Sequence, residues 1–408
     1  MSIRSCNTAI VGSSILISRR SDGVRKSALQ MQVEAGIAAM KEAGIGREQV
    51  GALFTGRSPT SYFVPQFNMR VMNELKLCPS FTSEITSHGA GALGSLEYAA
   101  MAIESGAIDY ALCTTGDASG AWMDSKSNIT MNAAGEADPQ FERPYGPSTP
   151  SLYAIVAQRY LYESGNTRAH MAKVAVEHRK WALHHPDAVM YRKGPITVEE
   201  VLNSPVIASP LHLLDCAPWF PGGIATAVVL TRSDLAREHH PAPIYLAGVG
   251  QCITHEWITD RLELSGVGPS KARRNMTHTG AAVAAKRAYD MAGLKNADAD
   301  LAQSSAPFTF FSLMMLEELG YCGPGEAGAF VDGGGIDYEG GRPYNTSGGY
   351  LSFGQSAQGL YLLLETIQQL RGHALGRQVL GAKIGLVHGH GGPMAAHTVV
   401  LVSSDQLN

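Results

Sequence analysis

The first third of the chain alternates between short apolar runs and longer segments with helical spacing. Runs rich in β-branched and aromatic residues predict strands, whereas apolar residues three and four apart predict helices. The predicted strands cover 8–14, 52–56, 80–87 and 109–117, and the predicted helices cover 27–44, 63–77 and 89–106, with Gly44 after the first helix and Pro65 in the first turn of the second. This order predicts a parallel or mixed sheet with helices on its faces.

The alternation stops after residue 117 and resumes in the second half of the chain. Residues 118–220 hold polar stretches, prolines and two predicted helices, 149–165 and 167–185. We interpret this segment as an insertion that covers one end of the sheet. A strand at 225–231 then closes the first half.

The second half repeats the β-α order. Its predicted strands cover 243–251, 300–306, 383–390 and 395–403, and its predicted helices cover 275–293, 310–320 and 357–372. The repetition suggests a duplicated fold. We therefore expect one half at 1–242, which includes the insertion, and a second half at 243–408.

Composition narrows the function classes. The 408 residues are 45% hydrophobic and 17% charged, with a net charge of −4, so we expect neither nucleic acid nor an anionic membrane as a partner. No apolar run reaches the length of a membrane span, and the N-terminus does not resemble a signal peptide. The six cysteines form no C-x-x-C pair, so no zinc site or disulfide framework is expected and a cytoplasmic location fits.

Several long motifs occur in a fixed order along the chain. They are AGIGREQVGALFTG (43–56), HMAKVAVEHRKWALHHPDA (170–188), PITVEEVLNSPVIASPLHLLDC (195–216), LMMLEELGYCGPGEAGAFV (313–331), PYNTSGGYLSFGQSAQG (343–359) and LVHGHGGPMAAHTVVLV (386–402). Together they resemble the thiolase superfamily, in the branch of sterol-carrier-protein-type thiolases, lipid-transfer-type retro-aldolases and acetyltransferases with small partner subunits. The resemblance implies an α/β thiolase fold, with two related βαβαβαββ halves in five αβαβα layers, dimers, and CoA thioester substrates.

The resemblance places a serine where thiolases carry their nucleophilic cysteine. The family pattern E-x-x-C-A-S-G-G matches EITSHGAGAL, so the cysteine position falls on Ser87. A serine hydroxyl needs an adjacent base to act as a nucleophile. His88 follows directly, but neighbouring side chains point apart. We expect Ser87 to act as nucleophile, to line bound substrate together with His88 and Gly89, or to be structurally neutral.

Two further family positions have lost their usual chemistry. Ala306 stands at the carboxylate position of the segment that ends in Phe308, which is retained and is a candidate substrate contact. Gln355 stands where the family's G-H-P-x-G loop carries histidine. Glutamine can donate a hydrogen bond to an oxyanion but cannot transfer a proton.

The N-x-x-G-G motif precedes that loop and is retained as Asn345, Gly348 and Gly349, which we expect to contact substrate. The related retro-aldolases use tyrosines, one of them in the loop of Gln355. Tyr350 lies five residues before that position and is a weak candidate for the role.

Histidines remain in the last motif. His388 aligns with the base position and His390 with the polar residue before Gly-Gly. Residues two apart on a strand point to one side, so both are candidates for catalysis or substrate contact, and no third ligand suggests a metal. His184 and His185 follow a predicted helix and are expected to be solvated.

Three functions remain open at this stage. The first is an acyl-CoA enzyme of the acyltransferase class in lipid or aromatic acid metabolism, with Ser87 as nucleophile, His388 or His390 as base and Gln355 as oxyanion donor. The second is a catalytically silent subunit that scaffolds an active partner. The third is a retro-aldol lyase acting on a CoA ester. In each case coenzyme A is part of the substrate and no bound cofactor is expected. The chain is expected to form a homodimer, or a heteromer with a thiolase-like paralogue or a small zinc-ribbon/OB-fold protein.

Overall fold

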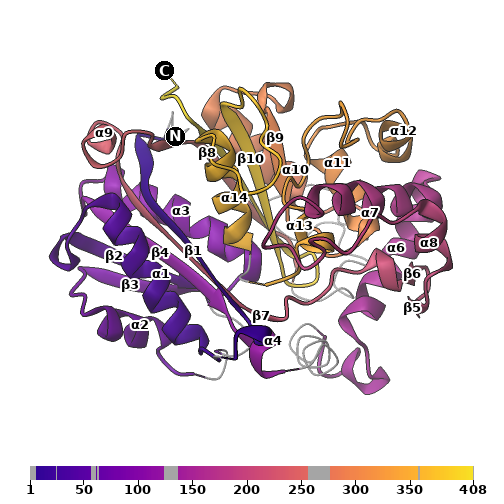
Figure 1. The fold of residues 1–408 in the computed structure, drawn as a ribbon, viewed down its shortest axis with the longest axis horizontal. Coiled ribbons are helices and arrows are strands. Elements are labelled where there is room, and N and C mark those ends of the chain that lie inside the picture. Colours follow the sequence, from indigo (N-terminus) through magenta and orange to yellow (C-terminus); the bar gives the residue numbers. More distant parts are fainter. Residues whose placement is uncertain are drawn as a thin grey trace.

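One mixed sheet of nine strands organises the molecule (Figure 1). The computed structural model describes residues 6–23, 25–56, 61, 64–123, 137–255, 276–356 and 359–407. The strand order is β3-β2-β4-β7-β1-β8-β11-β10-β9. The bounds are β1 Thr8–Arg19, β2 Val50–Gly56, β3 Phe81–Ile85, β4 Tyr110–Asp117, β7 Gly222–Arg232, β8 Ile244–Ile253, β9 Leu301–Ser304, β10 Ile384–Gly391 and β11 Ala396–Ser403.

The sheet consists of two sets of strands joined at β1 and β8. Strand β2 runs parallel to β3 and β4, and β9 runs parallel to β10, whereas the remaining neighbours are antiparallel. Only two residue pairs connect the sets, Ala9 with Tyr245 and Ile10 with Ile244. The five strands before this junction belong to the first half of the sequence and the four after it to the second, as the alternating pattern predicts.

Helices form layers on both sides of each strand set. Helices α1 (Ala28–Ala43) and α2 (Phe67–Leu75) cover the outer face of the first set, and α10 (Ala281–Ala292) covers β8 and β11. Helices α3 (His88–Glu104) and α14 (Leu360–Leu370) contact strands of both sets and therefore lie between them. The start of α3 is thus positioned at the centre of the molecule.

The insertion packs against the second half. Its helices α6 (Thr149–Ser164) and α7 (Arg168–Ala182) lie beside α11 (Thr309–Glu318) and α13 (Gly349–Ser352) (Figure 1). One buried apolar cluster combines insertion residues with residues of 247–401. The remaining short elements are α4 Ser119–Trp122, α8 Val198–Asn203, α9 Ala236–His239, α12 Ala327–Asp332 and the hairpin of β5 (Val206–Ala208) and β6 (Leu211–His212).

The predicted helix ends are partly correct. Ser27 caps α1 through its side chain, and Gly44 ends it in the left-handed conformation with φ 65°. The prediction that Pro65 lies in the first turn of α2 is wrong, because Gln66 adopts φ 52° and the helix begins only at Phe67. None of the helices in the described ranges is both long and apolar enough to cross a membrane.

Candidate active site around the start of helix α3

Ser87 stands at the N-terminal end of α3, directly after β3. Its side chain is half-buried and does not cap the helix. The first N–H groups of a helix have no partner inside it, and the dipole of this 17-residue helix makes its start electropositive. A helix start of this kind can hold a thioester oxygen or an oxyanion. The side chain of His88 lies outside the described part of the structure.

Strand β10 passes directly beside this helix start. A Cβ added to Gly389 would lie 2.6 Å from the carbonyl oxygen of Gly89 and 2.8 Å from Leu93, so Gly389 faces α3. Since side chains alternate along a strand, His388 and His390 point to the opposite face. There, Phe311 of α11 packs against His390 with ring centroids 5.0 Å apart. Across the described residues, no hydrogen bond joins Ser87 to either imidazole.

His388 belongs to a buried chain of hydrogen bonds. His397 Nε2 lies 3.1 Å from the carbonyl oxygen of Met394, which can only accept, so this nitrogen carries the proton. His388 Nε2 therefore donates to His397 Nδ1 over 3.0 Å, and Ser304 Oγ donates to His388 Nδ1 over 2.9 Å. Burial, together with nearby His390, lowers the pKa of His388 to about 3. His388 is thus neutral, with both ring nitrogens bonded to protein.

His390 makes a different set of contacts. Its Nδ1 lies 3.0 Å from Ser305 Oγ, and its backbone N–H donates to the same oxygen over 2.7 Å. Its Nε2 lies 3.2 Å from the hydroxyl of Tyr153, which also donates to the carbonyl oxygen of Gly392 over 3.0 Å. The imidazole is therefore held between a serine of the β9 end and a tyrosine of the insertion. The sequence analysis did not identify Tyr153, which has no local motif around it.

Tyr350 connects this histidine to the start of α3. It is 3% exposed and lies on α13 with its phenol oxygen against the Ser305 hydroxyl and the Gly359 N–H. A Cβ on Gly359 would lie 3.1 Å from the carbonyl oxygen of Gly89, so Gly359 packs on the first turn of α3. Burial raises the pKa of Tyr350, which therefore stays protonated at neutral pH. The order Tyr350, Ser305, His390 places an acid–base series beside the helix start.

The N-x-x-G-G motif contacts protein groups on both sides. Asn345 is fully buried, accepts from the Ser304 N–H over 2.8 Å, and its Nδ2 lies 3.4 Å from His178 Nε2. Gly348 adopts φ 94°, and a Cβ there would lie 2.5 Å from that of Ala182. Gly349 adopts φ 54°, and a Cβ there would lie 2.7 Å from the Asn345 amide. These contacts position the segment that leads into Tyr350.

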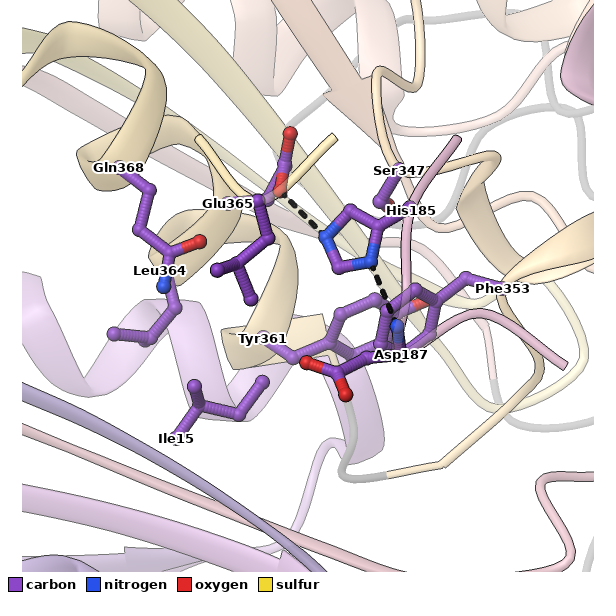
Figure 2. Close-up of a pocket in the computed structure, with 10 residues that line it drawn as sticks. Ile15, His185, Asp187, Ser347, Phe353, Tyr361, Leu364, Glu365 and Gln368 are labelled. Atoms are coloured by element: carbon purple, nitrogen blue, oxygen red, sulfur yellow. Dashed lines mark hydrogen bonds and ion pairs between the residues drawn. The ribbon is translucent and has the colours of Figure 1, made fainter. Parts of the chain in front are cut away.

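A buried ion pair lies beneath this motif (Figure 2). His185 Nε2 is 3.3 Å from Glu365 Oε2, and both side chains are at most 4% exposed. Glu365 also accepts from Thr346 over 2.6 Å and from Gln369 over 3.0 Å, and these bonds and His185 keep the pKa of Glu365 below its ordinary value despite burial. The prediction that His185 is solvated is wrong, because the chain after α7 turns inward onto α14. An adjoining pocket has room for about one water molecule.

The loop of Gln355 is held by its backbone. Its N–H donates to the Pro218 carbonyl over 2.8 Å, and its carbonyl accepts from the Phe220 N–H over 3.1 Å. Its half-buried side chain makes no hydrogen bond to any residue that the structure describes, so the amide is free to face a ligand. Phe308, in contrast, is 4% exposed and packs on Tyr153 with ring centroids 4.8 Å apart.

The cysteines do not replace the missing thiol. Burial raises the pKa of four of them to about 12, namely Cys6, Cys113, Cys216 and Cys322. None of the six occupies the start of α3. Within the described ranges, no group of three histidine, cysteine or acidic side chains could hold a metal ion.

Comparison with known proteins agrees with this architecture. The family model described as "Thiolase C-terminal domain-like" matches residues 268–404. An acetyl-CoA acetyltransferase of Methanothermobacter thermautotrophicus is 33% identical over 90% of this chain and 93% of its own. A 17-hydroxy-3-oxo-4-pregnene-20-carboxyl-CoA lyase of Mycobacterium tuberculosis is 33% identical over 85% of this chain and 87% of its own.

A solved structure described as an Ltp2-ChsH2(DUF35) aldolase superposes with a TM-score of 0.82 at 27% identity, and the match covers 100% of both chains. The human mitochondrial 3-ketoacyl-CoA thiolase in complex with CoA shares the fold, with a TM-score of 0.69 at 14% identity. Relatives of both chemistries therefore match over nearly the full length. The chain belongs to the thiolase superfamily, whose α/β fold it has.

Proposed function

We propose that this protein is a CoA-ester lyase that breaks a carbon–carbon bond by a retro-aldol reaction without a covalent intermediate. The observation that carries the proposal is the series Tyr350, Ser305, His390 beside an α3 start that holds a serine instead of a thiol. A retro-aldol cleavage needs a proton acceptor and a site for an enolate oxygen, but no nucleophile. The similarity to a CoA lyase and to an aldolase supports the same reaction.

The substrate in this proposal is a CoA thioester with a hydroxyl group on carbon 3. Its thioester oxygen binds at the start of α3, where the free N–H groups and the amide of Gln355 stabilise the developing enolate. Tyr350 takes the proton of the 3-hydroxyl while its own proton passes to Ser305, and the Ser305 proton passes to His390 Nδ1.

The electron pair of the C2–C3 bond then moves to the enolate, and carbon 3 leaves as an aldehyde or ketone. The enolate takes a proton at C2, supplied back from His390 through Ser305 and Tyr350. The products are a shorter CoA thioester and one carbonyl compound, and every group of the chain returns to its starting state. No cofactor is needed for this balance.

The acyl-transfer alternative with Ser87 as nucleophile is less well supported by the geometry. A serine hydroxyl requires a base in contact with it. His388 and His390 face away from α3 and are bonded to other protein groups. We therefore assign Ser87 to substrate contact.

We further propose that the protein works as a heteromer. The solved aldolase that matches over its full length is described together with a DUF35 partner. A small partner of that kind agrees with the resemblance of the insertion motifs, and a homodimer of this chain can form its core. The division into halves at residue 242 is part of this proposal, with the insertion completing the site from the first half.

The proposal is tested by incubating the protein, alone and with a DUF35-type partner, with 3-hydroxyacyl-CoA esters of different size. We expect a shorter CoA thioester and a carbonyl product by mass spectrometry, and no adduct on Ser87 by intact mass. The Tyr350→Phe variant should lose about 10²–10⁴-fold in kcat. Tyr361→Phe is the matched control, because Tyr361 is buried in the same aromatic stack but its hydroxyl reaches only the Gly354 carbonyl, 3.4 Å away.

Two results would overturn the proposal. An acyl adduct on Ser87, with transfer of the acyl group to a second CoA thioester, would establish an acyltransferase. The absence of turnover with every ester, with and without the partner, would favour the silent subunit.

A further inference from the structure

We infer that Tyr153, supplied by the insertion, sets the tautomer of His390, with the proton on Nε2 and the lone pair of Nδ1 directed at Ser305. The catalytic consequence rests on the proposed lyase function, whereas the tautomer itself does not. Tyr153 is then a positioning residue for the proton acceptor, and the insertion takes part in the chemistry.

The direction of the hydrogen bonds around Tyr153 carries this inference. The hydroxyl has one proton, and the carbonyl oxygen of Gly392, 3.0 Å away, can only accept it. At the contact with His390 Nε2, 3.2 Å long, the hydroxyl oxygen therefore accepts, so the proton belongs to Nε2. A neutral imidazole has one N–H, which leaves Nδ1 as the basic atom.

The contacts on the other side of the ring agree with that assignment. Ser305 Oγ accepts the backbone N–H of His390 over 2.7 Å, and its own proton is free to point at Nδ1, 3.0 Å away. If Nδ1 carried the proton instead, Ser305 Oγ would receive two protons from His390, and Nε2 would face a hydroxyl already committed to Gly392. The bonds form a consistent set only with the proton on Nε2.

Tyr153 has little freedom to leave this position. It is 2% exposed, and the rings of Phe308 and Phe311 lie 4.8 and 6.3 Å from its own. A rigid acceptor for Nε2–H matters twice. It keeps Nδ1 available before the reaction, and it supports the imidazolium that forms when Nδ1 takes a proton from Ser305.

The tautomer can be observed directly by NMR of protein labelled with ¹⁵N-histidine, with the His390 signals assigned by their loss in His390→Gln. In the wild type we expect the signals of an Nε2–H imidazole. In Tyr153→Phe, Nε2–H has lost its acceptor, and the Nδ1–H form that donates to Ser305 should appear. The same variant should lower kcat of the lyase about 10-fold or more, with KM changed less than two-fold.

The control is Tyr160→Phe on the same helix. Tyr160 is also 2% exposed and hydrogen-bonded, but its hydroxyl donates to Glu317 over 2.6 Å, away from His390. We expect Tyr160→Phe to leave the His390 tautomer unchanged.

The outcomes separate the inference from the function. An Nδ1–H imidazole in the wild type, or an identical tautomer in the wild type and Tyr153→Phe, overturns the inference even if lyase activity is found. If Tyr153→Phe does not fold, the wild-type tautomer alone decides. Expected tautomers together with no lyase activity would leave the positioning role of Tyr153 intact and reject the proposed reaction.

Discussion

The start of α3 and the end of β10 touch at Gly89 and Gly389, yet their polar groups are used in opposite ways. At the helix start, Ser87 has a half-buried side chain that does not cap the helix. On the far face of β10, His388 and His390 have both ring nitrogens bonded to protein. One region is open to a ligand, and the other is assembled before any ligand binds. In the proposed reaction the first binds the thioester and the second handles the proton.

The comparison predicts that changes in the assembled region cost stability. The largest effect is expected for Glu365→Ala, which leaves His185, Thr346 and Gln369 buried without their acceptor. Removing one member of a buried ion pair costs about 3–5 kcal/mol. The free energy of unfolding, measured in urea, should fall by that amount. Glu365→Gln, which keeps an oxygen for Thr346, is the milder control, and a loss below about 1 kcal/mol in the alanine variant would contradict the role of the pair.

The second prediction concerns pH and the buried histidines. Burial lowers the pKa of His178 and His388 to about 3, below the value of about 6.5 expected in the unfolded chain. Between pH 6.5 and 3 the unfolded state therefore binds more protons, and stability is lost as pH falls. Each histidine contributes a slope of up to about 1.4 kcal/mol per pH unit.

His388→Asn should flatten the stability–pH curve by one such increment in that range, besides its own loss of hydrogen bonds. Urea unfolding at a series of pH values measures it. His373 is exposed in the native structure, so His373→Asn should leave the curve unchanged. An unchanged slope in His388→Asn would mean that His388 is already charged in the folded protein.

A third, smaller effect tests the helix start itself. A thiol introduced as Ser87→Cys would lie at the N-terminus of α3, where the free N–H groups favour a thiolate. We expect it to react with iodoacetamide at pH 7 about five-fold faster than Cys78, which is exposed in the same chain and serves as the internal reference. Peptide mass spectrometry gives both rates. A slower reaction at residue 87 would show that the site is closed or not electropositive.

The smallest effect is expected for Ser87→Ala and Gln355→Ala. Both side chains are half-buried, and neither is bonded to a described residue, so stability should change by no more than about 0.5 kcal/mol. Urea unfolding compared with Glu365→Ala measures the contrast. A loss above 1 kcal/mol for either would place that side chain in the assembled region.

The sequence predicted the fold well because hydrophobic periodicity is local. The alternating runs identified the two strand sets, and the ordered motifs identified the superfamily. The motif positions also located Ser87 and the β10 histidines correctly along the chain, although their roles remain predictions.

What the sequence could not show is orientation and distant pairing. The motif reading treated His388 and His390 as equivalent, but only the placement of Gly389 against α3 shows which face they share. Tyr153 lies 237 residues from His390, and His185 lies 180 residues from Glu365, so neither pairing leaves a local signal. Such contacts depend on how the insertion docks onto the second half.

That docking has a consequence for the newly made chain. The apolar face of α6 is buried with Phe308, Phe310 and Phe311, which are synthesised some 150 residues later. At about 5–20 residues per second, the ribosome needs on the order of 10–30 seconds to deliver them. During that interval the insertion exposes an aromatic surface that the first half alone cannot cover. The insertion is therefore the segment that a nascent-chain chaperone should protect, and a ribosome stalled before residue 308 should display it.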